Sequence, residues 1–236
     1  HIFYCAFQAR PTWAEHNAPN LALLVNAVEP IAAVSKALEH VNLIQGTKYY
    51  GSHLGPFKTP AKESDPPHML PNFYWDQERW LRGAQSGQRW TWSALRPHAI
   101  CGFALGNPMN LMTCLAVYAA ISKELGLPLR FPGKPGTFDA VYQMTDSALL
   151  AKGITWAATT PAARNQVFNL TNGDFFRWCN VWPAIARAFD TTIAAIKSLN
   201  GLRTTRLTAG DRLTIRTPRS TTRATPVCSR SYSATM

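Results

Sequence analysis

Two residues in this sequence have side chains and positions suited to polar catalysis. Lys48 follows the predicted strand 41–44 in the tripeptide Gly46-Thr47-Lys48, and Tyr74 lies two residues after Asn72. A lysine at the end of a buried strand can meet a phosphate, a ribose hydroxyl or a phenol. A phenol becomes a useful acid when a nearby cation lowers its pKa from about 10. The alternatives are a solvated surface lysine and an aromatic side chain packed at a helix start.

Other catalytic and metal-binding patterns are absent from the sequence. The six histidines have no HxxxH or HxH spacing, and the five cysteines form no CxxC pair, so we expect neither a metal site nor a disulfide framework. Scattered cysteines fit a reduced, cytosolic compartment. There is no GxSxG, Walker loop or GxGxxG fingerprint. The start, His1-Ile-Phe-Tyr-Cys, does not read as a signal peptide, and no apolar run is long enough for a spanning helix.

Strand-like and helical segments alternate through most of the chain. Strands are predicted at 1–7, 41–44, 90–95 and 166–170, and helices at 20–41, 73–84 with Asn72 as cap, 109–125, 145–158, and from the turn at 172–174 to about 189. Such alternation predicts a mostly parallel α/β sheet, whose ligands bind at the carboxyl ends of the strands. Lys48 and the loop after Arg96-Pro97 lie at two such ends.

The charge is concentrated at the C-terminal end. The chain has 236 residues and a formal net charge of +11, of which +4 falls in 1–196 and +7 in 197–236. The last stretch is rich in Ser, Thr and Arg and holds one aromatic residue, Tyr232. We therefore expect a folded region at 1–190 and a basic tail at 191–236 that is disordered or translated out of frame.

Many segments together resemble the progesterone 5β-reductase/iridoid synthase-like (PRISE) family of atypical, extended short-chain dehydrogenases/reductases. The matching segments, in order, are His1-Ile-Phe-Tyr, Gly46-Thr47-Lys48-Tyr49-Tyr50, Leu54-Gly55-Pro56-Phe57, Asp65-Pro66-Pro67, Asn72-Phe73-Tyr74-Trp75-Asp76-Gln77-Glu78, Trp92-Ser93-Ala94-Leu95-Arg96-Pro97, Ile100-Cys101-Gly102-Phe103, Val117-Tyr118-Ala119-Ala120-Ile121, Pro128-Leu129-Arg130-Phe131-Pro132-Gly133, Ile154-Thr155-Trp156-Ala157-Ala158 and Asn172-Gly173-Asp174. The resemblance runs from residue 1 to about 190.

The resemblance implies an NADPH-dependent reductase of the C=C bond of enones. It implies that Tyr74 binds the substrate carbonyl and stabilises the enolate, while Lys48 holds the nicotinamide ribose and tunes Tyr74. Further cofactor contacts are implied at Ala6, Ile100, Asn107, Pro108 and Met109. Short-chain reductases usually place the lysine four residues after the tyrosine, but position 78 is Glu, so the lysine must come from elsewhere.

The implied fold is an incomplete Rossmann-type, doubly wound parallel sheet with part of a smaller substrate-binding region from about residue 103 onward. The family's first strands and its glycine-rich loop would lie upstream of His1, so we expect a fragment that binds NADP(H) weakly or not at all. The departures from the family pattern are Gln45, the Gly46-Thr47 order, an inserted Gly51-Ser52-His53, Trp75 and Arg79.

Two other functions stay open from the residues. One is an NAD(P)-dependent epimerase or dehydratase of the extended short-chain family. This function would need a lysine four residues after Tyr74, where the sequence has Glu78 instead. The other is a non-catalytic protein that binds a partner through its basic tail. Most of the net positive charge lies in this tail and little in the folded region, which argues against a nucleic-acid partner. The preferred reading is a cytoplasmic enzyme with a small enone substrate and no membrane partner, whose full-length relatives form homodimers.

Overall fold

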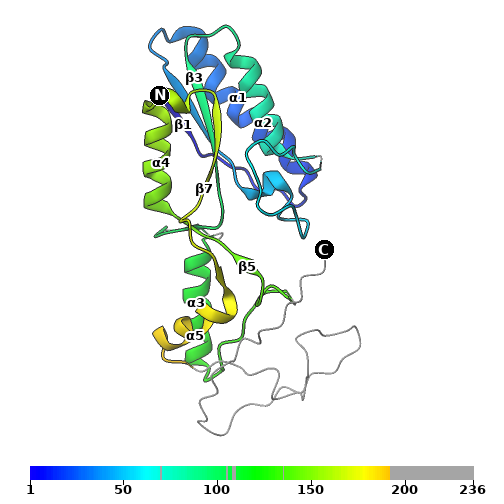
Figure 1. Ribbon diagram of the computed structural model, residues 1–236, viewed down its shortest axis with the longest axis vertical. Coiled ribbons are helices and arrows are strands. Elements are labelled where there is room, and N and C mark those ends of the chain that lie inside the picture. The colour runs from blue at the N-terminus through cyan, green and yellow to red at the C-terminus, as the bar shows by residue number, and fades with distance from the viewer. Residues whose placement is uncertain (70, 105, 108–109, 135, 192–236) are drawn as a thin grey trace. The chain divides into compact units, whose positions relative to one another are not determined.

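The computed structural model describes residues 1–191, except 70, 105, 108–109 and 135 (Figure 1). These residues fall into two compact units. The first comprises His1–Gly102 and Met144–Asn172, and the second comprises Phe103–Gln143 and the chain from Gly173 onward.

The predicted tail lies, apart from Thr191, outside the described residues. The start of the tail at residue 191 therefore stays a prediction. The substrate-binding role expected from about residue 103 onward also stays a prediction. Within the described ranges, the helices are too short or too polar to cross a membrane.

The first unit is built on a four-stranded sheet with parallel pairing throughout, in the order β1-β2-β3-β7. The strands are β1 (Ile2–Tyr4), β2 (His40–Ile44), β3 (Thr91–Pro97) and β7 (Gln166–Leu170). Helices α1 (Asn17–Val34) and α2 (Phe73–Gln85) cover one face of the sheet, and α4 (Ser147–Thr159) covers the other (Figure 1). A short parallel pair, β4 (Ile100–Cys101) with β6 (Thr145–Asp146), completes this unit. The predicted parallel α/β architecture is confirmed.

Alternation along the central strands sends side chains to two separate cores. Val41 and Leu43 of β2 pack with Trp92 of β3 beneath α1 and α2. Leu95 and Ile44 point the other way and pack with residues of α4. Because both faces of these strands are covered, their polar residues, such as Asn42 and Ser93, are buried as well as their apolar ones.

Several element boundaries differ from the sequence prediction. The helical period continues to residue 41, but α1 ends at Val34 and Ser35 is extended. Pairing of His40–Ile44 with strands on both sides outweighs the helical pattern there, since tertiary context overrides local propensity. The strand expected at 1–7 covers only Ile2–Tyr4, and Phe3 is 51% exposed. Strand β7 and the Asn72 cap agree with the prediction.

The second unit contains two helices and a short antiparallel strand pair. These are α3 (Leu111–Glu124), α5 (Trp178–Ala188), and β5 (Val141–Tyr142) with β8 (Phe176–Arg177). Phe131 contacts the rings of both Trp178 and Trp182, and the Trp182 indole donates to the Leu129 carbonyl at 3.1 Å. This aromatic packing holds α5 against the 129–131 segment.

A buried histidine makes the stability of the first unit depend on pH. His40 is 1% exposed, and its ring nitrogens lie 2.8 Å from the hydroxyls of Thr91 and Ser93. Burial lowers its pKa to about 4, assisted by the charges of the α-amino group and Arg164. An unfolded histidine titrates near pH 6.5, so between about pH 6.5 and 4 the unfolded chain binds the extra proton. We expect the free energy of unfolding to fall by roughly 3 kcal/mol from pH 7 to pH 4, measured by urea denaturation.

The matched control is His40→Gln, which keeps a polar group in the strand but removes the titration. Its unfolding free energy should vary less over the same pH range than that of the natural chain. An equal fall in both proteins would assign the effect to other groups.

Candidate functional site

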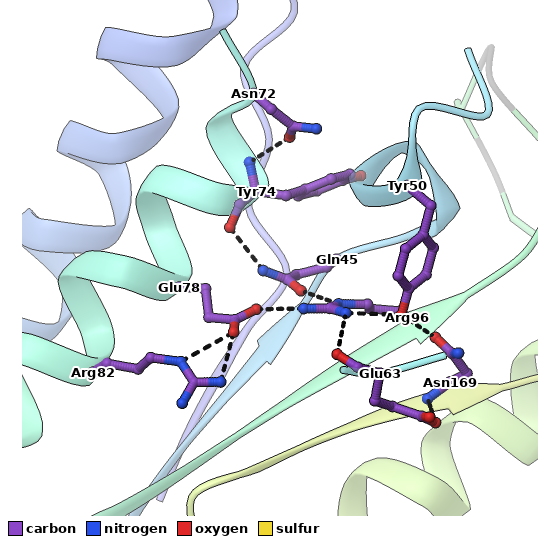
Figure 2. Close-up of polar contacts among 9 residues, drawn as sticks. All are labelled: Gln45, Tyr50, Glu63, Asn72, Tyr74, Glu78, Arg82, Arg96 and Asn169. Atoms are coloured by element: carbon purple, nitrogen blue, oxygen red, sulfur yellow. Dashed lines mark hydrogen bonds and ion pairs between the residues drawn. The ribbon is translucent and has the colours of Figure 1, made fainter. Parts of the chain in front are cut away.

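Tyr74 lies in the first turn of α2, against the carboxyl end of β2. The Asn72 side chain caps the helix by accepting a hydrogen bond from the Tyr74 amide at 3.1 Å. The phenol points toward the 3-10 segment η2 (Thr47–Tyr50) (Figure 2). A Cβ atom at Gly46 would lie 3.6 Å from the Tyr74 hydroxyl. The phenol therefore lies next to the backbone two residues before Lys48.

Lys48 lies in η2, directly after β2. The Asn72 Nδ2 group donates to the Lys48 carbonyl at 3.0 Å, so one side chain links the two segments. The Lys48 ammonium lies 5.2 Å from the centroid of the Trp13 ring. Among the described residues, neither this ammonium nor the Tyr74 hydroxyl has a hydrogen-bond partner. The structure thus brings the two segments together without direct contact between the two side chains.

Burial, rather than a neighbouring cation, governs the acidity of Tyr74. Desolvation raises its pKa to about 12. The tuning of Tyr74 by Lys48 that the resemblance implies would lower this pKa, and it stays a prediction. In this structure the Lys48 ammonium lies over the Trp13 ring. Tyr74 is consequently a neutral hydrogen-bond donor at physiological pH.

Aromatic and imidazole rings from three segments gather beside Lys48. The Trp13 ring lies 4.2 Å from His53 and 5.3 Å from Phe73, centroid to centroid. Burial lowers the pKa of His53, with the charges of Lys48 and His68 adding to the effect. The Trp13 indole nitrogen and both His53 nitrogens are buried without a hydrogen-bond partner among the described residues. Buried polar atoms of this kind usually have a partner, which can be a bound water, an ion or a ligand.

The other predicted cofactor-contact residues divide between the two units. Ala6 and Ile100 follow β1 and β3, as Lys48 follows β2, so all three lie at the carboxyl edge of adjacent parallel strands. Both Ala6 and Ile100 are exposed. Asn107 belongs to the second unit, and Pro108 and Met109 lie outside the described residues.

Behind the Tyr74 backbone lies a buried polar network centred on Arg96 (Figure 2). The Arg96 guanidinium forms an ion pair with Glu78 at 2.7 Å and donates to the Gln45 side chain at 2.8 Å. Gln45 in turn donates to the Tyr74 carbonyl at 2.7 Å. Burial lowers the pKa of Arg96, but the charge of Glu78 and the contact with Tyr50 outweigh it, so the pKa is raised overall.

The network was not predicted from the sequence. In the sequence, Glu78 shows only that the usual lysine is absent, and Arg96 marks only the end of a predicted strand. The available signal was a charged residue, Arg96, within a strand predicted to be buried, because a buried charge requires a partner. Among the described residues, no cluster of His, Cys, Asp and Glu could hold a metal ion.

The Asn72 cap supports a modest prediction. Asn72→Ala removes the acceptor for the Tyr74 amide and the donor to the Lys48 carbonyl. We expect a loss of about 1 kcal/mol of unfolding free energy, typical of an N-cap. Urea denaturation measures this, and Asn72→Asp, which keeps the cap acceptor, should lose less. Equal losses in both variants would remove the cap from the explanation.

A family model described as a PRISE-like Rossmann-fold domain matches residues 1–204. The chain belongs to this family. The PRISE-like match extends past residue 190, where the resemblance was expected to stop. An (S)-8-oxocitronellyl enol synthase of Nepeta racemosa is 39% identical over 198 residues, which are 80% of this chain and 50% of that protein. A 3-oxo-Delta(4,5)-steroid 5-beta-reductase of Arabidopsis thaliana is 36% identical, with the same coverage. This PRISE-like chain therefore spans about half the length of the curated relatives it matches.

Solved structures confirm the Rossmann-type fold of this PRISE-like chain. A UDP-glucose 4-epimerase of Thermus thermophilus in complex with NAD superimposes with a TM-score of 0.61 and 19% identity. The match covers 82% of this chain and 63% of that one. At this identity the likeness shows the fold alone.

The residues of this PRISE-like site fit the nicotinamide–ribose end of an NAD(P) cofactor. The Lys48 ammonium and the Tyr74 phenol have no hydrogen-bond partner among the described residues. Both lie at the carboxyl end of the parallel sheet, which is where dinucleotides bind in such folds. The unpartnered ring nitrogens of Trp13 and His53 add further polar atoms at this end. The sequence contains no glycine-rich fingerprint, so the fit concerns this end of the cofactor only.

Proposed function

We propose that the protein is an NADPH-dependent reductase of the C=C bond of enones. Membership of the PRISE-like family supports this activity, because its relatives include proteins named as a steroid 5-beta-reductase and as enol synthases. The observation that carries the proposal is the position of the Tyr74 phenol beside Gly46, two residues before Lys48. Neither the phenol nor the Lys48 ammonium, which lies over the Trp13 ring, has a hydrogen-bond partner among the described residues.

Tyr74 would bind the carbonyl oxygen of the enone. When bound, the cofactor supplies a hydride to the β-carbon of the substrate. The electron pair of the C=C bond then shifts and negative charge develops on the carbonyl oxygen. A neutral phenol donates a hydrogen bond to that oxygen and stabilises the enolate. A proton from water would then add to the α-carbon, which restores the carbonyl and gives the saturated ketone. With a pKa of about 12, Tyr74 stays protonated for this purpose throughout the neutral range.

Lys48 would hold the nicotinamide ribose. Its ammonium donates hydrogen bonds and carries charge, and the Trp13 ring fixes its direction at 5.2 Å. Ala6 and Ile100 would line the cofactor at the same edge of the sheet. Contacts of Asn107, Pro108 and Met109 with the cofactor stay predictions from the family resemblance. We further propose NADP(H) rather than NAD(H) as the cofactor, and the cytoplasm as the compartment.

The test is isotope transfer from the cofactor to an enone. The purified protein is incubated with millimolar NADPH deuterated at the transferable position and with a 3-oxo-Δ4-steroid or a small cyclic enone. Millimolar cofactor compensates for the weak binding expected of this chain. We expect a saturated ketone with deuterium at the β-carbon and a higher KM for NADPH in Lys48→Met. Reduction of the carbonyl to an alcohol, or no transfer, would contradict the proposal.

An epimerase activity is not favoured. The superimposed epimerases share the fold with this chain at 14–19% identity. The position that needs a lysine is Glu78, and its carboxylate is already paired with Arg96 and Arg82.

A further inference from the structure

We propose that Arg96 is a positioning residue for the reaction, with Glu78 as its counter-ion and Gln45 as its bridge to Tyr74. Its guanidinium sets the segments that carry Tyr74 and Lys48 relative to each other. The inference rests on the proposed function, because it assigns to Arg96 a role in that reaction from behind the site.

The first link runs from Arg96 to the backbone of Tyr74. The Arg96 Nε group donates to the Gln45 Oε1 atom at 2.8 Å, and the Gln45 Nε2 group donates to the Tyr74 carbonyl at 2.7 Å (Figure 2). Gln45 is itself buried, directly after β2. Because an amide has one acceptor end and one donor end, holding its oxygen on Arg96 directs its nitrogen toward Tyr74. The bridge therefore has a defined orientation.

The second link runs from Arg96 to the next turn of the same helix. The Arg96 Nη2 group pairs with the Glu78 Oε2 atom at 2.7 Å. Glu78 lies four residues after Tyr74, one turn further along α2. The Tyr74 carbonyl and the Glu78 carboxylate are thus held on successive turns. Together they fix the position of α2 along its axis and its rotation about that axis relative to the sheet. The direction of the Tyr74 phenol follows from that rotation.

The third link runs from Arg96 to the segment of Lys48. The Arg96 guanidinium carbon lies 3.3 Å from the centroid of the Tyr49 ring, and Nη1 donates to the Tyr50 hydroxyl at 2.7 Å. These two tyrosines follow Lys48 directly in η2. Tyr50 also donates to Asn169 at 2.7 Å, which anchors it to β7. One guanidinium therefore contacts both η2 and α2.

Only an arginine supplies this set of contacts. Its planar guanidinium has five donors in a fixed fork, whereas a lysine is a single point of charge. Arg96 is 1% exposed, so its charge is held in place by Glu78 and by the neutral acceptors around it. A lysine at this position could keep the ion pair but could not reach Gln45 and Tyr50 together.

Arg82 provides a matched control for a merely stabilising ion pair. It binds the same carboxylate, Glu78, at 2.8 Å, but its side chain is 52% exposed. It packs over the Trp92 ring at 4.5 Å and does not bond to Gln45 among the described residues. Removing Arg82 weakens the charge pairing of Glu78 without removing a link to Tyr74 or Lys48.

The experiment compares Gln45→Met, Arg96→Lys and Arg82→Met in the purified protein. Hydrogen–deuterium exchange is measured on peptides covering 46–50 and 72–78, together with kcat and KM for enone reduction. We expect faster exchange in both segments for Arg96→Lys, and in 72–78 for Gln45→Met. We also expect kcat to fall about tenfold in both, because a small misplacement of a reacting group is enough for such a loss. KM for the enone should change much less, and Arg82→Met should change neither exchange nor kcat.

Similar values of exchange and kcat for Gln45→Met and Arg82→Met would overturn the positioning role. The proposed function is tested separately, because it fails if Tyr74→Phe keeps the natural kcat. If Tyr74→Phe keeps the natural kcat, or if no enone reduction is observed, kcat no longer reports on the positioning role. The hydrogen–deuterium exchange data then decide whether Arg96 and Gln45 fix the two segments.

Discussion

Replacing Tyr74 by Phe is expected to lower kcat for enone reduction by about 10²–10³, the usual loss for one donor to a developing oxyanion. The substitution removes only a hydroxyl, and that hydroxyl has no hydrogen-bond partner among the described residues. Its stabilising contact is made only when charge develops on the substrate oxygen, so the affinity for NADPH should change little. Steady-state kinetics and a fluorescence titration with NADPH provide the two measurements.

Tyr4→Phe is the matched control for this prediction. Tyr4 is also buried, burial raises its pKa to about 12 as well, and its hydroxyl likewise has no partner among the described residues. It lies in the core beneath α1 and α2 instead of at the end of β2. Its loss should leave kcat unchanged. An equal fall in both variants would mean that the Tyr74 effect is structural. Because burial raises the pKa of Tyr74 to about 12, kcat should also show no fall due to this group between about pH 7 and 9.

The second large effect concerns stability. Arg96→Met leaves the Glu78 carboxylate buried with only Arg82 to compensate its charge. Breaking a buried ion pair from one side commonly lowers the free energy of unfolding by about 3–5 kcal/mol, because the remaining charge stays desolvated. That is a large part of the about 5–15 kcal/mol available to a typical domain. Urea denaturation at neutral pH measures the loss.

The double variant Arg96→Met/Glu78→Leu should recover part of this stability, because neither charge is then buried. Arg82→Met should lose less than about 1 kcal/mol, since the Arg82 side chain is half exposed and Glu78 keeps its buried partner Arg96. A double variant less stable than Arg96→Met would show that Glu78 stabilises the fold through contacts other than this pair.

The fold was largely predictable because its signals are local and strong. The strand predicted at 41–44 and the Asn72 cap of α2 each have a direct sequence signature, and both are confirmed. Parallel pairing followed from the alternation of strands with helices. The end of α1 was mispredicted because the helical period continues to residue 41, whereas the chain leaves the helix after Val34, turns at 36–37 and joins the sheet at His40. Only contacts distant in sequence decide that competition.

The candidate site was predictable as residue types but not as an arrangement. Lys48 and Tyr74 were singled out, and the structure places their segments together through Asn72. The direction of the lysine could not be foreseen, because it depends on Trp13, 35 residues earlier in the chain. Gln45 and Arg96 were missed because their roles depend on pairings between a strand, a helix and a 3-10 segment.

The pairing of Glu78 also limits the evolutionary routes open to this scaffold. A single change to lysine at position 78 would recreate the spacing used by most short-chain reductases. It would also leave three cations, at positions 78, 82 and 96, without the carboxylate that now binds two of them. Such an intermediate would lose stability, because Arg96 would be buried without a carboxylate partner, before the new lysine gave any benefit. Migration of the lysine between the helix and the strand end therefore requires coordinated replacement of Arg96, which makes the present arrangement hard to reverse one mutation at a time.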